Sequence, residues 1–177
     1  NRLVNDLLDL AKMEAGEMKL NITTININEL IRKCVIKLET LFLEKDLTVD
    51  ADFEEEDMKA KGDSDAIERV LVNLMHNAAK FTPRGGRIKV ITRKNKDKVE
   101  ITVADNGIGI DENELDMVWE RFYKTDKSRG RDKTGTGLGL AIVRNIINEH
   151  GQTISVQSKP GAGTAFTFTL AWAGNAD

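Results

Sequence analysis

Asn73, Asn77 and Lys80 are spaced so that they line one flank of a helix predicted from about residue 64 to 80. An asparagine carbonyl oxygen is a hard, neutral ligand for Mg²⁺, which also takes water and phosphate oxygens. The ammonium of Lys80 adds a point charge for phosphate. The segment NLMHNAAKF, which ends at Phe81, therefore fits a metal–phosphate complex. A solvated polar helix face is the simpler alternative.

The segment ADNGIGI, residues 104–110, follows a predicted strand and contains a second candidate group, the carboxylate of Asp105. An ionised carboxylate only accepts hydrogen bonds, so at the floor of a pocket it can receive the exocyclic amine of adenine. Gly107 and Gly109 would let the backbone pass close to a flat ring. An EF-hand calcium loop is excluded, because Gly107 stands where that loop needs Asp or Asn. A plain Asn-Gly turn remains the alternative.

A glycine-rich segment, GTGLGL, opens the last predicted helix. It consists of Gly135, Thr136, Gly137, Leu138, Gly139 and Leu140. Alternating glycines before a helix expose backbone N–H groups and the positive end of the helix dipole to an anion. The segment is not a Walker P-loop, because Thr136 follows Gly135 where that motif requires lysine. It also lacks the strand–turn–helix context of a dinucleotide-binding turn.

The segment WERFYKTD, residues 119–126, precedes a long polar stretch without apolar periodicity. We expect its aromatic residues, Trp119, Phe122 and Tyr123, to be core anchors that fix the start of that stretch. Lys124 begins the stretch, and its ammonium is solvated by default but could fold over phosphates. We expect residues 124–134, which include Lys127, Arg129 and Arg131, to form a mobile lid.

Hydrophobic periodicity predicts the elements that must hold these segments. Helices are expected at residues 1–19, 28–42 with Asn28 as N-cap, 64–80, 112–122 and 138–151. Strands are expected within residues 20–28, 47–53, 58–62, 87–94, 98–105, 153–158 and 164–170. This order predicts an α/β (α+β) fold, a two-layer sandwich of one mixed sheet with helices on one face, preceded by an N-terminal helical stub. We divide the chain into residues 1–20, a domain at 21–171 and a tail at 172–177.

The first helix carries an apolar stripe of Leu3, Leu7 and Leu10, widened by Val4, Leu8 and Ala11. Such a stripe needs another helix, either in its own domain or in a partner.

Composition narrows the class of protein further. The net charge of −3 argues against a nucleic-acid-binding surface, and no apolar run approaches the roughly 20 residues of a membrane-spanning helix. The single cysteine, Cys34, lies on the apolar face of its helix, so a buried thiol and a reducing cytoplasm are expected. A membrane anchor, if the protein has one, is expected outside this sequence.

The chain resembles the catalytic domain of sensor histidine kinases, members of the GHKL ATPase/kinase superfamily. The segments NLMHNAAKFTP, DNGIGI, WERFYK, GTGLGL and GAGTAFTF are similar, in this order, to the N, G1, F, G2 and G3 boxes of that family, over residues 21–171. The N-terminal LVNDLLDLAKMEAG resembles the end of the second helix of the family's dimerisation and phosphotransfer domain.

The resemblance implies ATP, or ADP, and Mg²⁺ as ligands. It implies that Asn77 coordinates the metal, that Asp105 binds adenine, and that the glycine-rich segment holds the phosphates. The expected catalytic residues are Asn73, Lys80 and Lys124. The expected nucleotide-binding residues are Asn73, Asn77, Lys80, Phe81, Asp105, Gly107, Gly109, Phe122, Gly135, Thr136, Gly137, Leu138 and Gly139. The implied partners are the kinase's own dimerisation and phosphoacceptor domain and a response regulator, with neither nucleic acid nor membrane contact.

Two features bear on the reaction. Neither His76, expected to face solvent, nor His150, expected to end the last helix, is followed by the acidic residue that marks the family's phosphoacceptor histidine. Water-using relatives such as gyrase, and the anti-sigma-factor kinases, carry a glutamate four residues before the metal-binding asparagine. Here that residue is Asn73, which cannot act as a base. The hypotheses are thus a histidine kinase, a water-using ATPase and a nucleotide-sensing pseudokinase.

Overall fold

The computed structural model describes residues 2–125 and 135–174. The helices are α1 (Arg2–Glu14), α2 (Ile27–Lys37), α3 (Glu39–Glu44), α4 (Ser64–Phe81), the 3₁₀-helix η1 (Glu112–Glu114) and α6 (Gly139–Glu149). The strands are β1 (Thr23–Asn26), β2 (Thr48–Phe53), β3 (Lys59–Gly62), β4 (Arg87–Asn95), β5 (Lys98–Asp105), β6 (Ile154–Lys159) and β7 (Gly163–Trp172).

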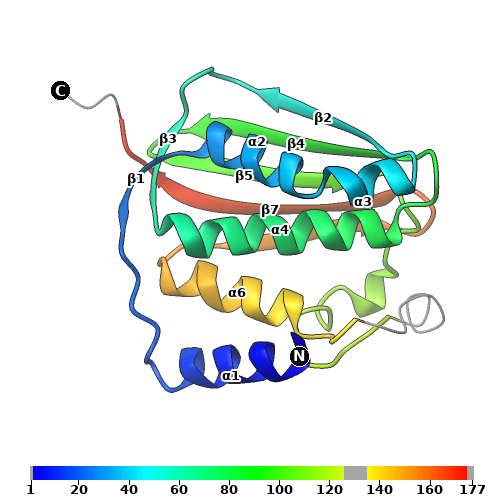
Figure 1. Ribbon diagram of the computed structural model, residues 1–177, viewed down its shortest axis with the longest axis horizontal. Helices are drawn as coiled ribbons and strands as arrows, with labels where there is room; N and C mark the ends of the chain where they lie inside the picture. Colours follow the sequence, from blue (N-terminus) through cyan, green and yellow to red (C-terminus); the bar gives the residue numbers. More distant parts are fainter. Residues whose placement is uncertain (1, 126–134, 175–177) are drawn as a thin grey trace.

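The strands form one mixed sheet in the order β1-β3-β7-β5-β4-β2, and β6 also pairs with β7. β2 and β4 run parallel, and the other pairs in the described residues are antiparallel. Figure 1 shows α2, α4 and α6 side by side over one face of the sheet, with α4 in the middle and α1 lying beyond α6. The predicted two-layer sandwich with a preceding helix is therefore confirmed.

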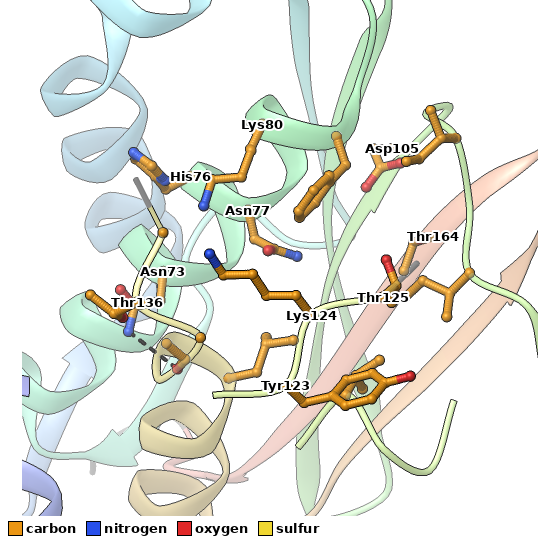
Figure 2. Close-up of a pocket in the computed structure, with 18 of the residues that line it drawn as sticks. Asn73, His76, Asn77, Lys80, Asp105, Tyr123, Lys124, Thr125, Thr136 and Thr164 are labelled. Atoms are coloured by element: carbon orange, nitrogen blue, oxygen red, sulfur yellow. Dashed lines mark hydrogen bonds between the residues drawn. The ribbon is translucent and has the colours of Figure 1, made fainter. Parts of the chain in front are cut away.

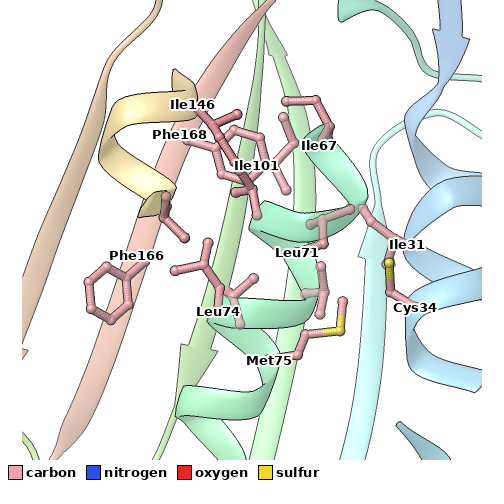
Figure 3. Close-up of a cluster of buried hydrophobic side chains, with 14 of the residues drawn as sticks. Ile31, Cys34, Ile67, Leu71, Leu74, Met75, Ile101, Ile146, Phe166 and Phe168 are labelled. Carbon is pink, nitrogen blue, oxygen red and sulfur yellow. The ribbon is translucent and has the colours of Figure 1, made fainter. Parts of the chain in front are cut away.

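The core lies between α4 and the sheet, where the helical and strand periodicities meet. Ile67, Leu71 and Leu74 face it from α4, and alternate residues such as Ile101 on β5 and Phe168 on β7 meet them. Figure 3 shows this cluster, with Ile31 and Cys34 of α2 on its other side. On both helices the buried residues recur at a spacing of three or four. α4 is thereby held along its whole apolar stripe.

Both ends of α4 are fixed by side chains. Asp63 is the N-cap, and its carboxylate accepts hydrogen bonds from the backbone N–H groups of Ala66 and Asn21. At the other end, the ammonium of Lys45 donates to the carbonyl oxygens of Ala79 and Lys80, which satisfies acceptors that the helix leaves open. The helix expected at residues 64–80 is confirmed, with Asp63 as its cap.

Cys34 of α2 is fully buried, as expected. Burial is the main cause that raises the pKa of its thiol to about 11, and the nearby carboxylate of Glu68 adds to the shift.

The helix expected at 28–42 differs in the structure. It begins after Asn26, whose side chain caps the N–H of Glu29, and it breaks at Leu38 into α2 and α3. Asn28 is not the cap, because its buried side chain is used elsewhere: the amide donates to two carbonyl oxygens of the acidic loop and its oxygen accepts from the hydroxyl of Thr92. Asn28 thus ties the helix to that loop and to β4.

The prediction of a helix at 112–122 was also wrong. Only the short η1 forms, and it is followed by turns closed by i→i−3 bonds, from Met117 N–H to Glu114 and from Glu120 N–H to Met117. Phe122 then adopts a left-handed backbone conformation, with φ of 61°, which a helix cannot accommodate.

α1 is shorter than expected, and its stripe is split. Leu10 and Met13 are buried against the domain, where α1 packs on α6, whereas four predicted members of the stripe remain exposed. Those four are Leu3, Val4, Leu7 and Leu8. Arg69 of α4 fixes the docked face through ion pairs with Asp6 and Asp9. The helix therefore packs on its own domain with the face that carries Asp6.

The sheet continues one residue beyond the expected domain end, because Trp172 still belongs to β7 and pairs with Ala60. The ammonium of Lys94 lies 3.8 Å from the centroid of the Trp172 ring. None of the helices that the structure describes is long and apolar enough to cross a membrane.

Candidate nucleotide-binding site

A cavity of about 110 Å³ lies beside α4, and all four segments singled out in the sequence contribute to its lining. Eleven of the expected site residues line it: Asn73, Asn77, Lys80, Phe81, Asp105, Gly109, Lys124, Gly135, Thr136, Gly137 and Gly139. The fold thus brings together residues that are up to 66 positions apart (139 − 73). No other expected site residue lines this cavity.

One wall of the pocket is the polar flank of α4. Figure 2 shows Asn73, Asn77 and Lys80 in a row on successive turns of this helix, as their spacing predicts. The Nδ2 atom of Asn73 lies 3.5 Å from the carbonyl oxygen of Gly139, so α4 touches the first residue of α6 at this point. The row of amides therefore faces the glycine-rich segment and the N-terminus of α6.

Asp105 lies at the other end of the pocket, at the end of β5 (Figure 2). Its Oδ1 accepts the backbone N–H of Gly107 at 2.9 Å. Burial raises the pKa of this carboxyl above its ordinary value, and backbone hydrogen bonds from Gly107 and Thr164 oppose part of that shift. The apolar side chains of Ile108 and Ile110 line the same pocket. This end suits a flat, largely apolar group that carries one hydrogen-bond donor.

The opposite end carries positive charge. Figure 2 shows the ammonium of Lys124 reaching across the pocket toward the side of Asn77, with Lys80 above it. The N-terminus of α6 opens into the same end through Gly139, and its dipole favours an anion. A ligand with an amine-bearing ring at one end and several negative charges at the other matches this arrangement.

Comparison with known proteins agrees with the geometry. Residues 62–173 match the profile of the histidine kinase-, DNA gyrase B- and HSP90-like ATPases, more than half of the chain. The catalytic domain of histidine kinase ThkA superposes with a TM-score of 0.76 at 30% identity, over 86% of this chain and 99% of that one. The chain belongs to this ATPase family, as a histidine kinase catalytic domain.

Other relatives match nearly the whole chain and not only its catalytic domain. This histidine kinase catalytic domain is 38% identical over 181 residues to hybrid signal transduction histidine kinase D of Dictyostelium discoideum, across 99% of this chain but only 12% of that protein. Full-length ShkA in complex with AMPPNP superposes with a TM-score of 0.87 at 26% identity, over 99% of this chain and 36% of ShkA. ThkA in complex with the response regulator protein TrrA also matches, over 98% of this chain and 49% of that one, with a TM-score of 0.78 and 26% identity.

Two glycines of the kinase domain act differently from the sequence-based expectation, which placed their backbone against a flat ring. A Cβ on Gly107 would lie 2.3 Å from the carbonyl oxygen of Phe81, and Gly107 does not line the pocket. A Cβ on Gly109 would lie 2.0 Å from the carbonyl oxygen of Lys159, and its φ is +74°. Both glycines are therefore required by contacts with protein backbone, and only Gly109 reaches the pocket.

Two other expected site residues do not line the pocket. Leu138 is fully buried, where it holds the glycine-rich segment in the core. Phe122 is 55% exposed and is not a core anchor, because its left-handed backbone turns the ring outward. Its backbone nonetheless matters, since its N–H donates to the carbonyl oxygen of Gly137 at 2.9 Å. Trp119 does pack inward, edge-on against Phe166.

The expected lid falls mostly outside the described residues, which stop at Thr125 and resume at Gly135. Lys127, Arg129 and Arg131 all lie in that gap, so their expected role remains a prediction. Thr125 itself lines the pocket beside Lys124.

The two histidines have distinct environments. His76, which was expected to face solvent, is half-buried and lines the pocket. His150 caps the end of α6, where its Nε2 accepts the backbone N–H of Asp63 and its Nδ1 faces the carbonyl oxygen of Ile146. Both ring nitrogens of His150 are therefore engaged by the protein backbone.

Several lining residues had not been predicted as site residues: Arg2, Ile108, Ile110, Val118, Tyr123, Thr125, Leu140 and Thr164. Thr164 could have been found, because strand pairing places it opposite Asp105. Ile108 and Ile110 alternate with the glycines of the same segment. Arg2 carried no signal, because only the docking of α1 brings it near.

The donor set of this site also fits a magnesium ion. Asn77 offers a neutral amide oxygen in a pocket that holds cationic side chains and, among the described residues that line it, Asp105 as its one acid, which suits a metal that arrives with phosphate oxygens and water. Among the described residues, no group of three or more His, Cys, Asp or Glu side chains could hold a metal by itself.

Proposed function

We propose that this domain binds Mg·ATP and transfers the γ-phosphoryl group to a histidine on a separate helical domain, for relay to an aspartate of a response regulator. The observation that carries the proposal is the single pocket with an acidic, partly apolar end at Asp105 and a cationic end at Lys80, Lys124 and the N-terminus of α6. ATP matches this arrangement, because its adenine carries an amine donor at one end and its triphosphate carries negative charge at the other.

In this proposal the carboxylate of Asp105 accepts the adenine amine, and Phe81 with the two isoleucines of residues 108–110 covers the ring. Lys80 and Lys124 neutralise charge on the phosphates, and the backbone N–H groups of residues 135–139 hold them. Asn77 would hold Mg²⁺, which supplies further neutralisation of the phosphate charge. Catalysis then rests on positioning and electrostatic stabilisation, as is usual for phosphoryl transfer.

Transfer to a protein acceptor is favoured over hydrolysis by the chemistry of Asn73. This residue occupies the position where a base for water would be needed, but a carboxamide does not accept a proton near neutral pH. Its amide instead points to the carbonyl oxygen of Gly139. Background hydrolysis should therefore be slow.

The acceptor should lie on another domain. Neither histidine of the chain is followed by an acidic residue, His76 is held on α4 and His150 is bonded at both ring nitrogens. The chain spans between 12% and 41% of the length of the first curated relatives that it matches, and these are named as histidine kinases. The buried single thiol suits the reducing cytoplasm, where we place the reaction.

The test is incubation with γ-labelled ATP and Mg²⁺, with and without the dimerisation and phosphoacceptor domain of the parent kinase. We expect acid-labile label on the added domain only. Acid-labile label on this chain alone would refute transfer to a separate domain, whereas label on neither chain, with ATP bound, would favour the nucleotide-sensing alternative. Rapid release of phosphate without acceptor would favour the water-using ATPase.

A further inference from the structure

Glu114 is a buried acid that the proposed mechanism does not use. It ends η1, and only 8% of its surface is exposed. Its Oε1 accepts a hydrogen bond from the phenolic hydroxyl of Tyr123 at 2.6 Å. That length is typical of a hydroxyl bonded to an ionised carboxylate, which is among the stronger hydrogen bonds in proteins. A buried acid is costly unless it is paired, so this contact needs an explanation.

The position of Tyr123 in the chain supplies one. Tyr123 directly precedes Lys124, and Figure 2 shows the two side chains leaving the backbone in opposite directions. The phenol points away from the amide row, whereas the ammonium of Lys124 reaches across the pocket toward it. Because the two residues share one peptide plane, holding the side chain of Tyr123 also restricts how the backbone at Lys124 can turn. The Tyr123 hydroxyl is therefore well placed to aim Lys124.

Glu114 is itself anchored to the sheet. The segment that leads to it starts at Ile110, whose N–H donates to the hydroxyl of Ser158 at 2.8 Å. Ser158 in turn bonds to the carbonyl oxygen of Gly163 at the start of β7. The backbone of Ile108 accepts from Gly161 in the same hairpin. The backbone that leads into η1 and Glu114 is thus tied to the β6–β7 hairpin of the sheet.

The other side of the segment is tied to the glycine-rich segment. Phe122 donates its N–H to the carbonyl oxygen of Gly137. This bond fixes where the chain enters the pocket. The Glu114–Tyr123 bond then holds the side chain one residue before Lys124.

We propose that Glu114 is a positioning residue that, through Tyr123, holds the ammonium of Lys124 over the phosphate end of the pocket. The inference rests on the proposed nucleotide site and extends it to a residue outside the segments singled out in the sequence. It predicts that loss of the Glu114–Tyr123 bond weakens the hold on the outer phosphates and leaves the adenosine end unaffected.

The test is calorimetric binding of ATP, ADP and AMP, each with Mg²⁺, to the whole chain and to its variants. Glu114→Ala and Tyr123→Phe should each weaken ATP binding by roughly five- to tenfold and leave AMP binding within about twofold. Glu114→Gln keeps an acceptor for the hydroxyl and should rescue most of the loss. Glu112→Ala removes an exposed acid from the same turn and should leave all three affinities unchanged.

A double-mutant cycle with Lys124→Met separates positioning from a general structural role. Once Lys124 is removed, Glu114→Ala or Tyr123→Phe should have little further effect on ATP binding. Full additivity, or equal losses for ATP and AMP, would overturn the inference. If Glu114→Ala does not fold, Tyr123→Phe decides, because it keeps the ring. If the unmodified chain binds ATP but no variant discriminates between ATP and AMP, only this inference fails; if it binds no nucleotide, the proposed function fails first.

Discussion

On one wall of the nucleotide pocket, Asn73, Asn77 and Lys80 stand on an 18-residue helix whose opposite stripe is buried in the core. On the other wall, the residues come mostly from the irregular segments 105–110, 123–125 and 135–139, which are held by hydrogen bonds and close contacts between loops. A side chain on the first wall can be replaced without moving the wall. On the second wall, the shape itself depends on particular residues.

This difference separates two kinds of substitution. On α4, a change should alter chemistry and leave stability almost untouched, because the polar flank does not pack in the core. In the facing segments, a change should alter shape and therefore stability as well as binding. The predictions below test that separation, in order of decreasing effect.

The largest effect should follow Asn77→Ala. Removing the proposed metal ligand should lower the rate of phosphotransfer by at least about a hundredfold, the upper range for disturbing even the outer partners of a metal. The melting temperature should hardly change, since alanine is a good helix former. Asn145→Ala is the matched control: its amide bonds to Ala141 within α6, outside the pocket. Equal activity in both variants would argue against the assigned role of Asn77.

Asp105→Asn should weaken ATP binding next most strongly. One carboxylate oxygen becomes a donor that faces the adenine amine, and loss of a charge-assisted bond suggests about 1.5–3 kcal/mol. Calorimetry gives this value directly. Asp52→Asn makes the same chemical change on β2, where the carboxylate pairs with Arg93, and should leave the affinity unchanged. An unchanged affinity in Asp105→Asn would contradict the proposal that Asp105 binds adenine.

Gly137→Ala should destabilise the protein, because φ is +74° and a Cβ would lie 2.7 Å from Cα of Phe122. A left-handed alanine alone costs about 1–2 kcal/mol. Gly139→Ala is the control within the same segment, since a Cβ there has no neighbour closer than 4.0 Å and no positive φ is required. Denaturant titration should show a loss for Gly137 and none for Gly139. Equal losses would contradict the proposed contact.

The smallest effect should be a pH dependence of ATP affinity. Burial raises the pKa of Asp105 in the free protein, and the hydrogen bond from adenine favours the ionised form, so binding lowers that pKa again. Affinity should therefore be full above the raised pKa and fall as the pH drops through it, by at most about tenfold per pH unit. Calorimetry in two buffers of different ionisation enthalpy should detect the released proton.

Asp63 provides the contrast for this experiment. Burial opposes its charge, yet backbone N–H groups of Asn21, Ala66 and Asp65 hold its pKa below the ordinary value. Asp63 therefore stays ionised over the range in which Asp105 titrates. Asp63→Asn should leave the slope of affinity against pH unchanged, and a slope that vanished in this variant would mean that Asp105 is not the titrating group.

The two walls were also unequally predictable from the sequence. The row on α4 was found correctly because a spacing of i, i+4, i+7 has one geometric meaning on a helix. The sheet and its layer of helices followed from periodicity in the same way. In the facing segments, no periodicity exists. Phe122 was expected to be a core anchor, but it is 55% exposed and its backbone is left-handed. The side chain of Leu138 is buried in the core, so only its backbone is available to a ligand.

Residues that depend on the docking of distant segments were missed altogether. Arg2 reaches the pocket because α1 docks on the domain, where Leu10 and Met13 are buried and Asp6 and Asp9 pair with Arg69. Glu114 looked like one acid among several in a polar turn, and its burial depends on Tyr123 nine residues later. Such contacts are set by tertiary packing, which the spacing of residue types does not encode.

Because Cys34 is buried between α2 and α4, its reaction with thiol reagents can report the separation of these two helices. Thiol reagents attack the thiolate, and with a pKa of about 11 and no exposed surface this sulfur is inert while α2 stays against α4. Because the chain contains no other cysteine, all thiol modification takes place at this buried position. When the reagent is concentrated enough for modification to outpace reclosing, the labelling rate measures how often α2 separates from α4; at lower concentration it measures the population of the open form.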